Sequence, residues 1–133
     1  MLPPDPAGRA RTRALSRFHD TRLEPAVRAL FAHLPGRTTP PDGFISSQSG
    51  VISQRLGQLG RTLEDRPDSP LPLMCDCGFP ITFAWLDALT PRMGLDLEWP
   101  GEVASYRARL GRMPAIAAEL ADYTPKLTAF LDG

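Results

Sequence analysis

Residues 77–89 read CGFPITFAWLDAL, and this stretch decides the fold. Phe79, Phe83 and Leu86 recur at the spacing of one helix face, while alanine and tryptophan fill the other faces. Asp87 is the only charged residue in the stretch. A helix that is apolar nearly all round is buried on all sides in a globular protein. We therefore expect a buried central helix of an all-α domain, too short to cross a bilayer.

Apolar residues continue at helical spacing on both sides of this stretch, and no segment alternates as a strand would. Asp5 suits a helix cap, since Pro6 follows it at the first helical position. Pro25 lies inside that first helix and predicts a kink, and Pro125 is expected to end the last helix. The pattern predicts a five-helix bundle in a single domain, residues 1–133, with a linker-like start at 1–5 and helices at about 6–34, 45–65, 74–93, 101–112 and 114–123.

Size and composition exclude several classes of protein. The chain has 133 residues, enough for one domain with its own core. It carries 15 basic and 15 acidic residues, and so lacks the basic excess of a nucleic-acid-binding domain. No apolar run reaches the length of a membrane span. Two cysteines are too few for a disulfide framework, so we expect a cytoplasmic protein without a nucleic-acid or membrane partner.

Asp76 is the only charged residue between Leu71 and Leu86, at the start of the predicted central helix. A carboxylate in a first helical turn can accept hydrogen bonds from free backbone N–H groups and oppose the helix dipole. We expect Asp76 to be a structural cap, whose replacement by alanine costs about 0.5–2 kcal/mol of stability.

Cysteine and histidine are sparse. Cys75 and Cys77 flank Asp76 and are interpreted as small core residues, although a thiol at a helix N-terminus can also be reactive. Together with His19 and His33 they do not have the spacing of a zinc site. We predict no metal site and no catalytic residue in this chain.

A polar stripe runs along the predicted first helix. Arg13, Arg17, Asp20 and Glu24 follow one another at helical spacing, opposite the apolar face. One interpretation is a solvated face with an intrahelical Arg17–Asp20 ion pair. The other is the polar wall of a substrate cleft or of a subunit interface. Both stay open on the residues alone.

Three segments together resemble the C-terminal helical domain of the glutathione S-transferase family, and the resemblance covers almost the whole chain. Residues 73–89, LMCDCGFPITFAWLDAL, are similar to that family's capping-box segment and buried helix, with Asp76 at the family's Asp position. The family's capping hydroxyl is absent, since Leu73 takes its place. Residues 99–121 resemble the later turn at which Pro114 opens a helix, and residues 2–31 resemble the linker and first long helix.

The resemblance implies that two domains have different roles. In that family an N-terminal thioredoxin-fold domain binds glutathione and carries the catalytic residue, and this domain is absent here. The helical domain supplies the wall for the hydrophobic substrate and part of the dimer interface. Arg13, Arg17, Asp20 and Glu24 lie on the helix that borders the cleft in relatives, so they become the candidate substrate-binding residues. Glutathione is then a co-substrate only when the missing domain is supplied.

The resemblance also bears on activity and partners. The chain alone is not expected to catalyse glutathione conjugation, and its partner is a second copy or a thioredoxin-fold domain, which we expect the DNA in frame before Met1 to encode. The alternatives are a non-catalytic helical interaction module, of the kind attached to translation factors and aminoacyl-tRNA synthetases, and a carrier of small hydrophobic ligands.

Overall fold

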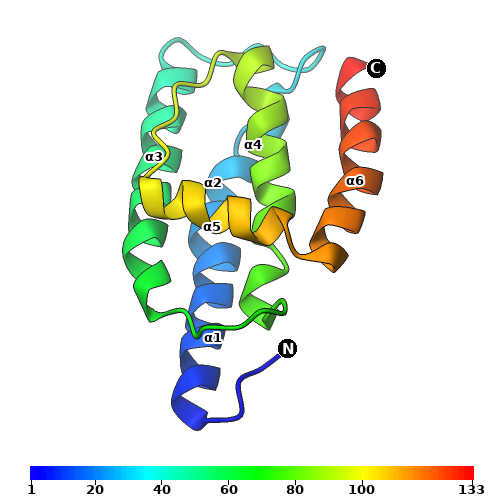
Figure 1. Ribbon diagram of the computed structural model, residues 1–133. Coiled ribbons are helices and arrows are strands. Elements are labelled where there is room, and N and C mark those ends of the chain that lie inside the picture. Colours follow the sequence, from blue (N-terminus) through cyan, green and yellow to red (C-terminus); the bar gives the residue numbers. More distant parts are fainter.

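A computed structural model describes residues 1–133, and all of its regular secondary structure is helical, without strands. The prediction of an all-α fold is therefore confirmed. Five helices have eleven or more residues, and a sixth is one short turn. Their bounds are α1 Pro6–Phe18, α2 Glu24–Arg28, α3 Phe44–Thr62, α4 Phe79–Met93, α5 Gly101–Gly111 and α6 Pro114–Asp132. In Figure 1, α5 crosses in front of the bundle and α6 stands at its side.

The first predicted helix, 6–34, is not one helix. After α1 a π-helical turn spans His19–Leu23, then α2 follows, and a 3-10 turn at Phe31–His33 ends the segment. In the π turn the backbone N–H of Glu24 donates to the carbonyl of His19, five residues earlier. Pro25 has no N–H, so the helix cannot continue its regular bonding pattern there. The extra residue of a π turn shifts the helix phase, and both ends of this turn, His19 and Leu23, are buried.

Helix α4 lies at the centre of the core. Phe79, Phe83, Leu86 and Leu89 leave at most 2% of their surfaces exposed. The expectation of burial on all sides is wrong, however, because Ile81 and Trp85 are only half-buried. An apolar pattern all round a helix does not distinguish a helix that is covered within the chain from one that presents a face to something else.

The last helix continues beyond the predicted end at residue 123. Helix α6 runs to Asp132 and includes Pro125. A proline inside a helix removes one backbone hydrogen bond, and here the freed carbonyl belongs to Ala121, which is exposed and can be hydrated. Packing holds both sides of the proline: Trp85 donates a 2.8 Å hydrogen bond to the Tyr123 hydroxyl, and Leu127 is buried.

No helix combines the length and the apolar character needed to cross a membrane.

Candidate functional site

A buried polar network holds the start of the central helix. Asp76 is fully buried, and its carboxylate faces the Arg66 guanidinium, whose side chain is 2% exposed. Arg66 Nε and Nη2 donate to Oδ1 and Oδ2 of Asp76 at 2.9 and 2.6 Å. The Tyr106 hydroxyl donates to Oδ1 at 2.5 Å, and the backbone N–H of Leu73 donates to Oδ2 at 2.8 Å. One carboxylate thus joins α5, the turn before α4 and the segment after α3.

The network also determines which of its side chains are ionised at neutral pH. Burial opposes ionisation of Asp76, but the hydrogen bonds from Arg66 and Tyr106 outweigh it and hold the pKa of Asp76 below its ordinary value. Burial beside this carboxylate raises the pKa of the Tyr106 hydroxyl. Burial also raises the pKa of Cys75 to about 12. At neutral pH the chain therefore holds an ionised Asp76 and an un-ionised, unreactive Cys75.

Asp76 performs half of a capping box. Its carboxylate accepts the Leu73 N–H, whereas the Leu73 side chain has no atom that accepts a hydrogen bond. The Asp76 N–H donates to the Leu73 carbonyl instead, at 2.9 Å, as part of a 3-10 turn. Arg66 and Tyr106 were not identified from the sequence. They lie ten and thirty residues away, and no local pattern points to either of them.

The predicted polar stripe does not form one site. Arg13 and Arg17 are exposed and make no ion pair, so the expected Arg17–Asp20 pair is absent. The Asp20 carboxylate instead lies 2.8 Å from Nδ1 of His19, and Glu24 pairs with Arg28 at 2.6 Å. The π turn separates the arginines from Glu24, because it rotates the residues that follow it. Of the four, Glu24 lines a hollow beside α4.

His19 joins the π turn to α4. Its Nε2 lies 2.7 Å from the Thr82 hydroxyl, and its ring packs edge-on against Phe79 at a centroid distance of 5.0 Å. The ring also covers Gly78, where a Cβ atom would come within 2.5 Å of it. Since His19 is 8% exposed and satisfied at both ring nitrogens, it positions the first turn of α4. His33 packs elsewhere, against Phe44, and no cluster of three possible metal ligands forms.

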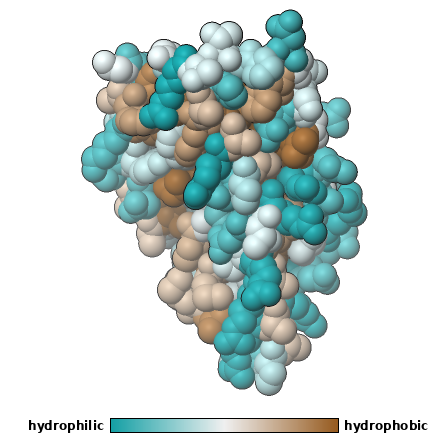
Figure 2. All heavy atoms as spheres, turned by 180° about the vertical axis from the view of Figure 1, so that it is seen from behind, coloured by the Kyte–Doolittle hydropathy of each residue, from teal (hydrophilic) through white to brown (hydrophobic).

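Beside this first turn lies the feature that we call the α4 groove. It consists of two adjoining hollows of about 460 and 260 Å³ that share Cys77 and Ile81. One hollow reaches the start of α6, and the other reaches α2 and the 3-10 turn after it. Figure 2, which shows the molecule from behind, has apolar spheres over much of its left half and also at its upper right. The apolar residues that line the groove are Met1, Val27, Phe31, Leu71, Pro72, Pro80, Ile81, Trp85, Ala115 and Ile116.

The groove is suited to contact with another protein surface and not to nucleophilic catalysis. Cys77 is its only thiol, and burial together with the neighbouring Asp76 carboxylate raises the pKa of Cys77. The thiol is thus less nucleophilic at neutral pH than an ordinary cysteine. Comparisons with models of protein families, with curated proteins and with solved structures found no match for this chain.

Proposed function

We propose that this chain is the helical half of a glutathione-dependent transferase or isomerase, and that a thioredoxin-fold domain packs on the α4 groove. The observation that carries the proposal is the exposure of large apolar side chains at the groove. Met1 and Leu71 leave 71% and 69% of their surfaces open, beside half-buried Ile81 and Ile116. The sequence resemblance to the helical domain of glutathione S-transferases supports the same assignment.

The groove has the composition of an interface between protein domains. Most of its lining residues are apolar, and the charged residues Glu24, Arg28, Glu119 and the buried Asp76 line it as well. Protein contacts combine apolar and polar groups, and an exposed apolar patch favours association. The Met1 carbonyl accepts a 2.8 Å hydrogen bond from Met74 N–H, so the first residues run beside the groove. A domain joined to residue 1 would therefore lie next to this surface.

In this proposal the two halves have different tasks. Activation of a glutathione thiol needs a group that lowers its pKa or binds its anion. Neither cysteine of this chain is activated, since both thiols have raised pKa values. The other domain would bind glutathione and activate it, and the groove side of α4 would contribute Ile81, Trp85 and Phe31 as an apolar wall for the second substrate.

The test compares the chain alone with a longer chain that includes the segment encoded in frame before Met1. Both are assayed with glutathione and 1-chloro-2,4-dinitrobenzene and applied to glutathione resin. The longer chain should bind the resin and catalyse conjugation, and Ile116→Asp, in the groove but outside the proposed substrate wall, should lower its activity by disturbing the domain contact. Turnover by the 133-residue chain alone would contradict the proposal.

The alternative is a non-catalytic interaction module that uses the same groove for a protein partner. Its supporting observation is also the apolar groove without an activated thiol. A longer chain that leaves glutathione unbound and still buries the groove would favour this alternative.

A further inference from the structure

The outer face of α3 carries glycine in the middle of the helix. Gly50 is exposed, and a Cβ atom at this position would meet nothing within 4 Å. At Gly57, two turns later, only the end of the Arg61 side chain comes near, at 3.8 Å. Glycine inside a helix is destabilising relative to alanine, and one use that offsets this cost is the close approach of another backbone. Within this chain no backbone approaches either glycine.

An acidic edge runs beside these glycines. The backbone N–H groups of Asp96 and Glu98 donate to the hydroxyls of Ser49 and Ser53 on α3, at 3.1 and 3.0 Å. Since the two serines are one helical turn apart, about 6 Å, the two acidic residues are held at the same spacing along α3. Both are exposed, and with Gly50 they line an open hollow of about 630 Å³. We call Gly50, Gly57, Asp96 and Glu98 together the acidic α3 face.

The outer face of α1 has the opposite charge. Arg13 and Arg17 are exposed and lie one helical turn apart, and the small residues Ala10 and Ala14 are exposed beside them. We call these four residues the basic α1 face. The first turns of α1 project below the other helices in Figure 1, so another molecule can reach this part of the helix.

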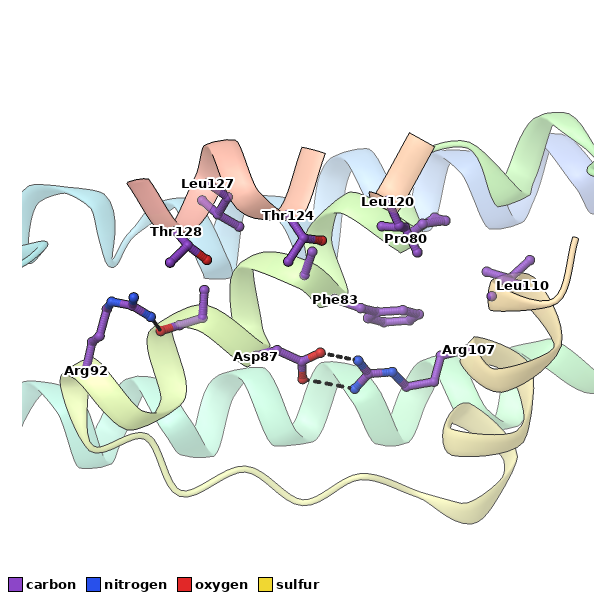
Figure 3. Close-up of a pocket in the computed structure, with 13 residues that line it drawn as sticks. Pro80, Phe83, Asp87, Arg92, Arg107, Leu110, Leu120, Thr124, Leu127 and Thr128 are labelled. Carbon is purple, nitrogen blue, oxygen red and sulfur yellow. Dashed lines mark hydrogen bonds and ion pairs between the residues drawn. The ribbon is translucent and has the colours of Figure 1, made fainter. Parts of the chain in front are cut away.

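The charges of these two faces have no partners within the chain. Elsewhere, Asp87 and Arg107 form an ion pair with two hydrogen bonds (Figure 3), and four other arginine or lysine side chains also pair with acids. No such pair includes a residue of the basic α1 face or of the acidic α3 face. The two arginines and the two acidic residues share a spacing of about 6 Å. Each arginine of one copy can therefore face one carboxylate of another.

We propose that two copies of this chain form a two-fold symmetric dimer, in which the basic α1 face of each copy packs on the acidic α3 face of the other. The alanines of α1 and the glycines of α3 let the two helix backbones approach closely. Complementary charges fix the register and exclude a like-charged surface. Two-fold symmetry makes both contacts at once and closes the assembly. The dimer contact shares no residue with the α4 groove, so it does not rest on the proposed function.

The test is sedimentation equilibrium of the 133-residue chain at concentrations up to about 0.1 mM. The parent should form a reversible dimer, which NaCl weakens at least about tenfold between about 0.05 and 0.5 M, because salt screens exposed charges. Arg13→Glu/Arg17→Glu and Asp96→Lys/Glu98→Lys should each be monomeric alone. An equimolar mixture of the two variants should dimerise, because both contacts then join opposite charges. A monomeric parent, a dimer insensitive to salt, or a mixture that stays monomeric would overturn the proposal.

Three further variants locate the contact. Gly50→Leu fills the space that the second copy needs and should weaken the dimer at least about tenfold. Gly111→Leu is the matched control, since Gly111 is another helical glycine with nothing within 4 Å of its Cβ position. Ile116→Asp changes the α4 groove instead. Both controls should leave the dimer unchanged, and thermal unfolding establishes that each variant is folded. A dimer that survives Gly50→Leu, or that either control removes, would place the contact elsewhere and overturn the proposal.

Discussion

The Tyr106 hydroxyl donates a 2.5 Å hydrogen bond to the Asp76 carboxylate, across thirty residues of sequence. Both side chains are buried, and the same carboxylate accepts two bonds from Arg66. The pair ties α5 to the turn that begins the central helix. It also means that Asp76 does more than cap a helix, because its charge compensates a buried guanidinium.

Asp76→Ala should cost about 3–5 kcal/mol of unfolding free energy, the range for removing one partner of a buried ion pair. This exceeds the 0.5–2 kcal/mol expected for a cap alone, because the variant leaves the Arg66 guanidinium buried without its acid. Urea unfolding measures the difference. Asp122→Ala is the control, since its ion pair with Lys126 is exposed at both ends. Equal losses in the two variants would show that the Asp76 network contributes nothing beyond a surface pair.

Tyr106→Phe should cost about 1.5–3 kcal/mol, the range for a hydrogen bond to a charged group. The substitution keeps the ring, which packs edge-on against Phe79 at 5.8 Å. The loss therefore reports the hydroxyl and not the core contact. Chemical denaturation of both proteins gives the value, and coincident midpoints would exclude a stabilising role for this bond.

Stability should depend on pH through Asp76. Its pKa in the folded state lies below the ordinary value of 3.8, so the unfolded chain takes up the proton first as the pH falls. The contribution of the carboxylate is complete above a pH of about 5 and is lost as the pH drops through 3.8 toward the folded pKa. The gap in unfolding free energy between the parent and Asp76→Asn should therefore shrink from pH 6 to pH 3. A constant gap over that range would mean that the pKa is not lowered by folding.

Gly78→Ala should destabilise the fold by about 1–3 kcal/mol, the usual cost of overpacking. The added methyl would lie 2.5 Å from the His19 ring. In a His19→Ala background the same substitution should be neutral or stabilising, since alanine favours a helix over glycine. Gly111→Ala is the control, because nothing lies within 4 Å of its Cβ position. A double-mutant cycle on thermal unfolding tests this coupling, and additive effects would contradict it.

The helices were largely predictable because the periodic apolar residues are local information. Their interruptions were harder to predict. Pro25 indicated a kink, but whether the chain bends or forms a π turn depends on the contacts of His19 with Thr82 and Gly78 on a distant helix. Pro125 indicated a helix end, yet the packing of Tyr123 and Leu127 carries the helix through it.

The cavities could be predicted less well than the helices. Asp76 stood out because a lone charge in an apolar stretch is visible in the sequence. Its partners Arg66 and Tyr106 could not be found that way, since tertiary folding alone brings them together. The predicted stripe assumed one unbroken helix through Arg13, Arg17, Asp20 and Glu24. The π turn at His19–Leu23 interrupts that helix, so the assumption was wrong. The α4 groove depends on which faces of α4 stay open.

The reactivity of Cys77 directly tests whether a second domain covers the α4 groove, which is the central claim of the proposed function. Cys77 is exposed in the groove, whereas Cys75 is buried and serves as an internal control. In the 133-residue chain, a thiol reagent such as 5,5′-dithiobis(2-nitrobenzoate) should label Cys77 and leave Cys75 unlabelled until the protein unfolds. In the longer chain that includes the segment encoded before Met1, labelling of Cys77 should slow by at least about tenfold, and Ile81→Asp should restore it. An unchanged labelling rate in the longer chain, or a stop codon in frame directly before Met1, would contradict this domain contact.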